Sequence, residues 1–379
     1  MPEKLSIIRH FLHSVPELSG KERETARYLT KILAETNPNE LWTEVGGTGV
    51  VAIYQGNQPG KVIGIRADLD ALPIQESGNL PYKSKNKGIA HSCGHDGHMA
   101  IVAGVAYYIS QRRDSLAGTV IVIFQPEEET GTGAAKMLTD QRMRSIRFDA
   151  VLALHNLPGF EKHSLIVREG AFTSNTTGMI IRLHGATSHA GHPENGNSPV
   201  MAMTGLINSL NSLPQTCVPI HRSALVTIVH ARLGERAFGT TPGYAHIMLT
   251  MRAHEATDLE AMKNKATVII RNSAEAYNLR EEIEFVEDYP AMINDEELTK
   301  ILVTIGEKLD LPIICREHPF SWSEDFSRFA QRAPGLLIGL GSGIDSPQLH
   351  NANYDFPDEL LETGYRIFIE MINLLTGIL

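Results

Sequence analysis

The chain has 379 residues, of which 42% are apolar and 21% are charged, and its formal net charge is −10 at neutral pH. This length exceeds what one ordinary hydrophobic core supports, so a globular protein of two domains is expected. The acidic balance, and the lack of a basic run interleaved with aromatic residues, argue against a nucleic-acid-binding protein.

The sequence also predicts no association with a membrane. The longest apolar run, residues 99–109, is shorter than the roughly 18 residues that a membrane span needs. The first ten residues have neither a long apolar core nor a small-residue cleavage site, which predicts no signal peptide. Three cysteines (Cys93, Cys217 and Cys315) cannot all pair. So few thiols suit a reducing compartment, and we expect a cytoplasmic protein.

The first part of the chain predicts helices followed by strands. Apolar periodicity and β-rich composition predict two helices and then two strands, at residues 3–13, 20–35, 49–54 and 62–67. The second strand runs into Asp68 and Asp70. Open α/β sheets bind ligands outside the carboxyl ends of their strands, so this carboxylate pair is a candidate site. Turn formation or helix capping is the alternative role for the pair.

The stretch 91–98 holds three histidines, one thiol and one carboxylate in eight residues, and a helix from about 97 to 111 follows it. Cys93 and His95 stand two residues apart, so a turn can direct both at one point. Thiolate and imidazole are common ligands of first-row metal ions. The alternatives are a polar surface loop, or a cysteine hydrolase in which Cys93 is the nucleophile and a histidine is its base.

Two further predicted strands also end at side chains that bind metals. The strand at 119–124 runs into Glu127, Glu128 and Glu129. Three adjacent carboxylates at a buried strand end repel one another unless a cation lies near. A solvated loop is the alternative. The strand at 150–154 ends at His155, which by itself is more often a packed or capping residue than a ligand.

The middle of the chain predicts a separate domain. From about 173 to 289 the order of elements is β-α-β-β-α-β, which indicates a ferredoxin-like antiparallel sheet covered by two helices. Its loop at 185–193 carries His189 and His192, which are either surface histidines or groups that reach a site on another domain or subunit. The α/β pattern resumes after Asp295.

The last part of the chain returns to helices and strands. The pattern predicts, in order, a helix to about 309, two strands and a final helix, the last three at 312–315, 335–339 and 357–375. His350 follows the last of these strands.

One thiolate, three imidazoles and a carboxylate are therefore available, enough for one or two metal ions. A second glutamate can act as general base on a metal-bound water, which indicates hydrolysis of an amide or ester. A binding or sensing protein that keeps the metal loop without cleaving anything is a further alternative.

Seven motifs spread over nearly the whole chain resemble the amidohydrolase branch of the M20 metallopeptidases, the group that includes hippurate hydrolase, indole-acetyl-amino-acid hydrolase and N-acyl-amino-acid deacetylases. The motifs are RADLDALP (66–73), HSCGHDGH (91–98), FQPEEE (124–129), LHN (154–156), SHA (188–190), SEDF (323–326) and LHN (349–351).

This resemblance implies an α/β, zinc-peptidase-like catalytic domain with a mixed sheet flanked by helices, formed by residues 1–173 and 290–379. An inserted ferredoxin-like domain, 174–289, is implied to be the lid and the site of homodimerisation. The implied reaction is cleavage of the amide bond of a small N-acyl amino acid, such as an N-acetyl amino acid, or of a related small amide.

The resemblance further implies two divalent ions per subunit (zinc, manganese, nickel or cobalt), with Cys93 as the bridging thiolate. The remaining implied ligands are His95, Glu129, His155 and His350. Glu128 is implied to be the base and later the acid. His189, from the lid of the partner subunit, is implied to stabilise the oxyanion, and Arg252 is a candidate to bind the substrate carboxylate.

Two positions depart from the family pattern. Glu127 stands where the family usually has a small residue, so the base and the ligand are Glu128 and Glu129 only if the register holds. Gly239 stands where the family commonly has an asparagine that contacts substrate. Glycine offers no side-chain donor or acceptor, so altered or looser substrate recognition is expected.

Overall fold

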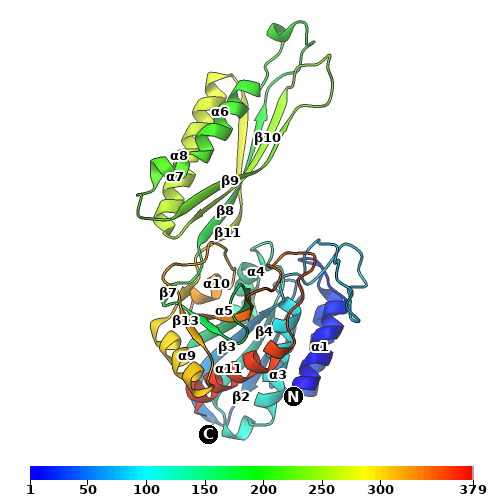
Figure 1. The fold of residues 1–379 in the computed structure, drawn as a ribbon, viewed down its shortest axis with the longest axis vertical. Helices are drawn as coiled ribbons and strands as arrows, with labels where there is room; N and C mark the ends of the chain where they lie inside the picture. Colours follow the sequence, from blue (N-terminus) through cyan, green and yellow to red (C-terminus); the bar gives the residue numbers. More distant parts are fainter. Residues whose placement is uncertain (378–379) are drawn as a thin grey trace. The chain divides into compact units, whose positions relative to one another are not determined.

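The computed structural model describes residues 1–377, which form two compact units (Figure 1). Unit 1 contains Met1–Phe172, Met292–His318 and the chain from Glu324 onward, whereas unit 2 contains Thr173–Ala291 and Pro319–Ser323. The chain therefore enters unit 2 twice. The return at 319–323 was not part of the expected boundaries.

Unit 1 is built on an eight-stranded mixed sheet. In spatial order its strands are β1 (Glu40–Val45), β2 (Gly49–Gln55), β4 (Ala117–Gln125), β3 (Gln58–Asp68), β5 (Ala150–Pro158), β14 (Gly335–Gly343), β6 (Leu165–Val167) and β13 (Ile313–Cys315). The central strands β4, β3, β5 and β14 are parallel neighbours. Their carboxyl ends therefore lie at one edge of the sheet, and residues that follow these strands come together there.

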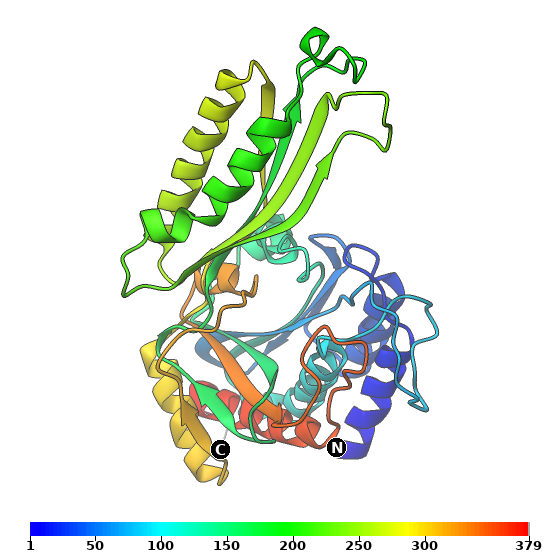
Figure 2. The ribbon, with the colours of Figure 1, turned by 45° about the horizontal axis from the view of Figure 1, so that its top comes forward.

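Helices cover both faces of this sheet. The helices of unit 1 are α1 (Pro2–Ser14), α2 (Arg23–Glu35), α3 (His95–Ser110), α4 (Gly133–Thr139), α5 (Gln141–Arg144), α9 (Glu296–Lys308), α10 (Ser327–Ala330) and α11 (Glu359–Thr376). Helices α1, α3 and α11 contact one another and share one core with the sheet (Figure 2). Helices α4 and α10 contact β4 and β14. The central strands are buried on both faces, which explains their nearly continuous apolar sequences.

Helix α3 is the central helix of unit 1, and every residue from His95 to Ile109 is buried. A helix buried all round has no amphipathic stripe, and its sequence from Met99 onward is apolar on every side for this reason. The helix begins at His95, two residues before the predicted start. Its first turn therefore carries His95 and His98 into the interior of unit 1 instead of leaving them in a loop.

Unit 2 is a four-stranded antiparallel sheet with helices on one face. Its elements are β8 (Asn175–His184), α6 (Val200–Asn211), α7 (Leu213–Cys217), β9 (Ala224–Leu233), β10 (Tyr244–Ala253), α8 (Ala256–Ala276) and β11 (Arg280–Tyr289). The spatial order is β11-β8-β10-β9. The β-α-β-β-α-β order predicted from the sequence is present, with the short α7 added after α6. Helices α6 and α8 lie side by side over the sheet (Figure 2).

Among the described residues, no helix has the length and apolar character needed to cross a membrane.

Candidate metal centre

The loop before α3 places Cys93 at the carboxyl-terminal edge of the sheet. Gly94 has φ of +92°, a conformation that disfavours other residues, and a Cβ there would lie 2.4 Å from Oδ1 of Asn156. Glycine is therefore required at this turn on two grounds. The turn brings Sγ of Cys93 to 3.7 Å from Nε2 of His155, which lies in β5.

The structure brings together all five residues that the sequence suggested as metal ligands. Two groups of potential ligand atoms, each within 4.8 Å of one another, share Cys93. One group adds His95 and His155, and the other adds Glu129 and His350. The Glu129 carboxylate lies 3.7 Å from Nε2 of His95 and 3.6 Å from Nε2 of His350. The shared thiol suits a bridging position between two ions.

Two imidazole rings are oriented by backbone carbonyl groups. Nδ1 of His95 lies 2.8 Å from the carbonyl oxygen of Asp70, and Nδ1 of His155 lies 2.9 Å from that of Asn156. A carbonyl oxygen can only accept a hydrogen bond, so each Nδ1 carries the proton when the ring is neutral. The Nε2 lone pair of each ring then faces the thiol and carboxylate side, the arrangement that metal-binding histidines use.

Unpaired polar atoms test whether these residues fit a metal ion. Within residues 1–377, Nε2 of His95 and Oε1 of Glu129 are buried and have no hydrogen-bond partner. They lie 3.7 Å apart. A cation between two such atoms offsets the cost of burying them unpaired. The donor set of thiolate, imidazole and carboxylate is one that first-row divalent ions prefer, so the residues present fit such ions.

Burial and neighbouring charges shift the pKa values of the acids and bases at this site. Burial, with Asp70 nearby, raises the pKa of Glu129 to about 7. Burial lowers the pKa of His155 to about 3, and His98 adds to the effect. Burial also raises the pKa of the Cys93 thiol well above its ordinary value, with Glu129 adding to the shift. A raised thiol pKa disfavours a free thiolate nucleophile and argues against the cysteine hydrolase alternative.

Glu128 lies beside the potential ligands in a cluster of acids. The Glu128 carboxylate belongs to two sets of neighbouring ligand atoms. One set contains His95 and Glu129, and the other contains Glu324 and Asp325. Burial, followed by the negative charge of Glu324, raises the pKa of Glu128 well above its ordinary value. The backbone N–H groups of Glu128 and Glu129 donate to the two carboxylate oxygens of Asp70, at 3.1 and 3.0 Å.

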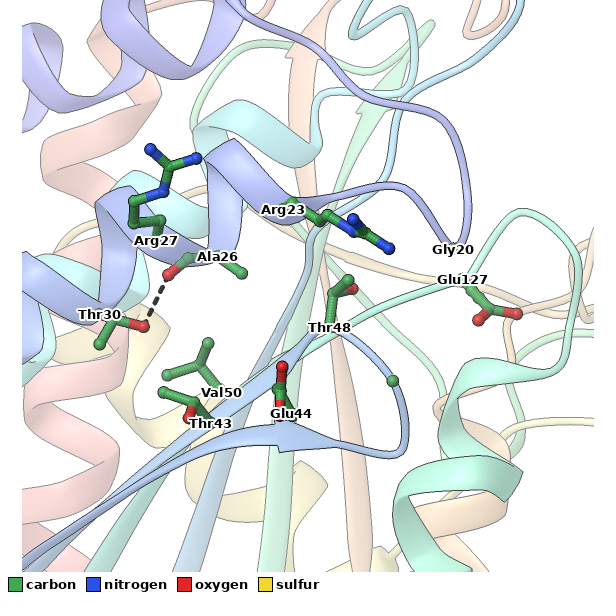
Figure 3. Close-up of a pocket in the computed structure, with 11 residues that line it drawn as sticks. Gly20, Arg23, Ala26, Arg27, Thr30, Thr43, Glu44, Thr48, Val50 and Glu127 are labelled. Carbon is green, nitrogen blue, oxygen red and sulfur yellow. Dashed lines mark hydrogen bonds between the residues drawn. The ribbon is translucent and has the colours of Figure 1, made fainter.

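Glu127 points away from this cluster. Its φ of +53° is left-handed, and its Oε2 accepts hydrogen bonds from Oγ1 of Thr132 and from Nζ of Lys136 at 2.7 and 2.5 Å. Its side chain lines a separate cavity of about 750 Å³, opposite Arg23 and Thr48 (Figure 3). The structure therefore separates Glu127 from Glu128 and Glu129, the register that the sequence left open.

A backbone hydrogen bond fixes the position of His350. Its φ of +64° is left-handed, and its N–H donates to the carbonyl oxygen of Ser92 at 2.8 Å. This bond joins the loop after β14 to the loop that carries Cys93. Two segments more than 250 residues apart in the sequence thus meet at the same edge of the sheet.

His189 and Arg252 belong to unit 2 and are not members of these clusters. His189 is exposed, and its Nδ1 accepts a hydrogen bond from the N–H of Gly191 at 3.0 Å. Arg252, near the end of β10, is partly buried. Its Nη1 donates to Oγ1 of Thr176 at 3.1 Å and to the carbonyl oxygen of Ser321 at 2.9 Å.

No role was predicted for Arg66, Glu324 or Asp325, although they lie within the motifs quoted above. In the structure the Arg66 guanidinium forms ion pairs with Asp68, Glu324 and Asp325 at 2.8, 3.0 and 3.1 Å, and all four side chains are buried. The one available signal was a charged residue at position 66 inside the otherwise apolar stretch 62–67.

Comparison with known proteins gives consistent matches over the whole chain. Residues 64–374 match the peptidase family M20/M25/M40. An N-acetyl-L-cysteine deacetylase of Bacillus subtilis is 31% identical over 97% of this chain and 87% of its own length. A hippurate hydrolase of Campylobacter jejuni is 32% identical over 93% of this chain and 92% of its own length.

A solved structure from Bacillus subtilis, described as a dinuclear metal binding peptidase from the M20 family, matches with a TM-score of 0.83 and 28% identity. The match covers 100% of this chain and 99% of the other.

Proposed function

The chain belongs to the peptidase family M20/M25/M40, and from this premise we propose that it is a metal-dependent amidohydrolase that cleaves the amide bond of N-acyl amino acids or related small amides. The observation that carries the proposal is the position of Glu128 beside two potential ligand groups that share Cys93. The relatives support the substrate class, since their names specify an N-acetyl amino acid and hippurate.

We propose that Cys93, His95, Glu129, His155 and His350 would hold two divalent ions, with Cys93 as the thiolate that both ions would share. The ions are zinc, manganese, nickel or cobalt, since thiolate favours zinc and the three imidazoles also suit the others. When bound, the ions supply the positive charge that polarises the amide carbonyl and lowers the pKa of a water molecule.

In this proposal Glu128 moves the proton. Its carboxylate accepts a proton from the attacking water and later passes it to the nitrogen of the leaving amine. Burial and the neighbouring acids raise the pKa of Glu128, so its carboxylate can take up a proton, as both steps require. Asp70 holds the backbone of Glu128 and Glu129 and so keeps the two side chains in their separate roles.

The proposal assigns the remaining recognition to unit 2, as lid and dimerisation domain. Nδ1 of His189 accepts a hydrogen bond, so Nε2 carries the proton of the neutral ring and can donate to an oxyanion. Arg252 can bind the substrate carboxylate through its guanidinium.

A homodimer through unit 2 is supported by the edge strand β9. Leu225, Val229 and Leu233 of this strand are exposed. The opposite edge strand, β11, is rich in glutamate, which disfavours strand pairing there.

The test is a hydrolysis screen across N-acetyl and N-benzoyl amino acids, with released amine as the readout. Metal-free protein is prepared with a chelator and reloaded with each of the four ions, and Glu128→Gln serves as the matched inactive control. We expect turnover only in reloaded parent protein. Full activity of the metal-free protein, or no amine release with any ion and any substrate, would overturn the proposal.

A further inference from the structure

Asp325 binds both ends of the loop that carries Glu128 and Glu129. Its Oδ1 accepts a hydrogen bond from Nε2 of Gln125, the last residue of β4, at 2.6 Å. Its Oδ2 accepts from the N–H of Ala134, in the first turn of α4, at 3.0 Å. The loop at 126–132 therefore begins and ends on a single buried carboxylate.

The backbone of Asp325 contacts the middle of the same loop. Its N–H donates to Oε1 of Glu128, with 3.3 Å between the nitrogen and the oxygen. The side chain of Asp325 therefore binds the two ends of the loop, and its backbone N–H binds the Glu128 carboxylate between them.

Asp325 is itself anchored by a buried cation. Nη2 of Arg66 lies 3.1 Å from Oδ1 of Asp325 and 3.0 Å from the carboxylate of Glu324. Nη1 of the same guanidinium lies 2.8 Å from Asp68, which in turn accepts from Nδ1 of His98 at 2.8 Å. Arg66 is 2% exposed and Asp325 is fully buried, so water does not compete for these bonds.

We infer that Asp325 is a positioning residue for the reaction, which sets the place of the Glu128 carboxylate without touching substrate. This inference rests on the proposed role of Glu128 as base. Proton transfer requires heavy atoms about 2.6–3.2 Å apart, and a displacement of about 1 Å can lower the rate about 10²-fold. The Asp325 carboxylate accepts hydrogen bonds from Arg66 of β3, Gln125 of β4 and Ala134 of α4. These bonds restrict displacement of the loop that carries Glu128.

A double-mutant cycle separates positioning from general stability. Asp325→Asn keeps the shape of the side chain but loses its charge. It also replaces one acceptor oxygen by an NH2 donor, which then faces either the N–H of Ala134 or the donors of Gln125 and Arg66. In the metal-loaded parent we expect kcat to fall about 10²-fold with KM within about threefold. In a Glu128→Asp background the carboxylate is already displaced by one methylene group, so a further shift of the loop matters less and the same change should lower kcat by less than about threefold. Equal losses in both backgrounds would overturn the inference.

Two further variants supply a control for the double-mutant cycle and a substitute for Asp325→Asn. Asp258→Asn is the control, because Asp258 is a buried carboxylate of unit 2 that pairs with Arg222 at 3.1 Å and has no part in the site. Its kcat should equal that of the parent. If Asp325→Asn does not fold, Gln125→Met is carried through the same cycle, with a loss of about tenfold expected. At similar volume it removes the Nε2 donor to Asp325 and the Oε1 acceptor of Nε of Arg66.

Hydrogen exchange of the full chain tests the inference without activity. Asp325→Asn should speed exchange of the amides at 127–134 at least about tenfold, whereas Asp258→Asn should leave them unchanged. If the parent protein releases no amine from any substrate but the two variants show this exchange pattern, the proposed function is rejected and Asp325 is retained as the anchor of the loop. Unchanged exchange in Asp325→Asn would reject the anchor itself.

Discussion

Nδ1 of His13 lies 2.8 Å from Oδ2 of Asp96, and Nε of Arg9 lies 2.8 Å from the same oxygen. All three side chains are at most 1% exposed. Asp96 directly follows His95, so helix α1 contributes two cationic groups behind the segment that carries the potential metal ligands. Burial lowers the pKa of His13, but the hydrogen bond and charge of Asp96 outweigh it and raise that pKa to about 9.

This pair predicts that stability declines with rising pH. A histidine whose pKa is raised by folding from 6.5 to about 9 contributes its full stabilisation below pH 6.5 and loses it as pH rises through 9. The difference corresponds to about 3 kcal/mol. We expect the free energy of unfolding of metal-free protein, measured in urea, to fall across this window.

The His13→Gln variant is the comparison for that measurement, because other groups of the metal-free site also titrate. The slope of stability against pH should be shallower in His13→Gln than in the parent between pH 6.5 and 9. Parallel curves for the two proteins would contradict the assignment.

Removal of the buried guanidinium should be strongly destabilising. Arg66→Met leaves Asp68, Glu324 and Asp325 without their shared cation, and we expect a loss of about 3–5 kcal/mol in urea denaturation. The control is Arg182→Met, which removes a half-exposed ion pair with Glu284 at 3.0 Å and should cost less than about 1 kcal/mol. Similar losses in both variants would show that Arg66 is not the hub of this network.

Cys93 should determine how many metal ions the chain holds. Because its thiol belongs to both potential ligand groups, Cys93→Ala should lower the bound metal from about two ions per chain to one or none. Elemental analysis after dialysis measures this. Cys217→Ala, a change of a cysteine in unit 2, should retain the parent content. Equal metal content in Cys93→Ala and the parent would exclude a bridging thiolate.

The three adjacent glutamates should differ sharply in effect. Glu127→Gly relieves a left-handed backbone strain of about 1 kcal/mol and removes the Lys136 pair, so stability should change by less than about 1 kcal/mol. Its kcat should stay within about threefold of the parent, whereas Glu128→Gln should lose about 10²–10⁴-fold. A large loss of kcat in Glu127→Gly would reverse the assignment of the base.

Gly239 offers a test of substrate preference. A Cβ at this position would meet nothing within 4 Å, so asparagine fits without displacing a neighbour. An added amide can donate and accept a hydrogen bond, and we expect Gly239→Asn to change the ratio of kcat/KM between N-acetyl and N-benzoyl substrates. An unchanged ratio would show that position 239 does not contact substrate.

That the potential ligands lie close together could be predicted, because the prediction depends on short sequence patterns. Each of β3, β4 and β5 is an apolar run followed at once by a polar side chain, and parallel neighbours end at the same edge of a sheet. The strand β1 was missed because its residues are mostly exposed or half-exposed at the sheet edge. The three-residue β6 was also missed, although β13, which is equally short, was predicted.

The supporting contacts were not predictable. Arg66 and Asp325 are 259 residues apart, and His13 and Asp96 are 83 apart. Periodicity describes which face of an element is buried, but it does not say which distant charge compensates a buried one. The second passage into unit 2 at 319–323 has the same origin, because its hydrogen bonds to β8 and β10 join residues more than 60 positions apart.

The parallel pairing of β14 with β5 has a consequence for synthesis of the chain. It joins Gly335 to Val151, and all four strands of unit 2 lie between them in the sequence. On the ribosome, unit 2 can complete its sheet while β5 still lacks its neighbour. A nascent chain stopped before residue 335 therefore presents the open, apolar edge of β5, and this is the edge where we expect chaperones to bind.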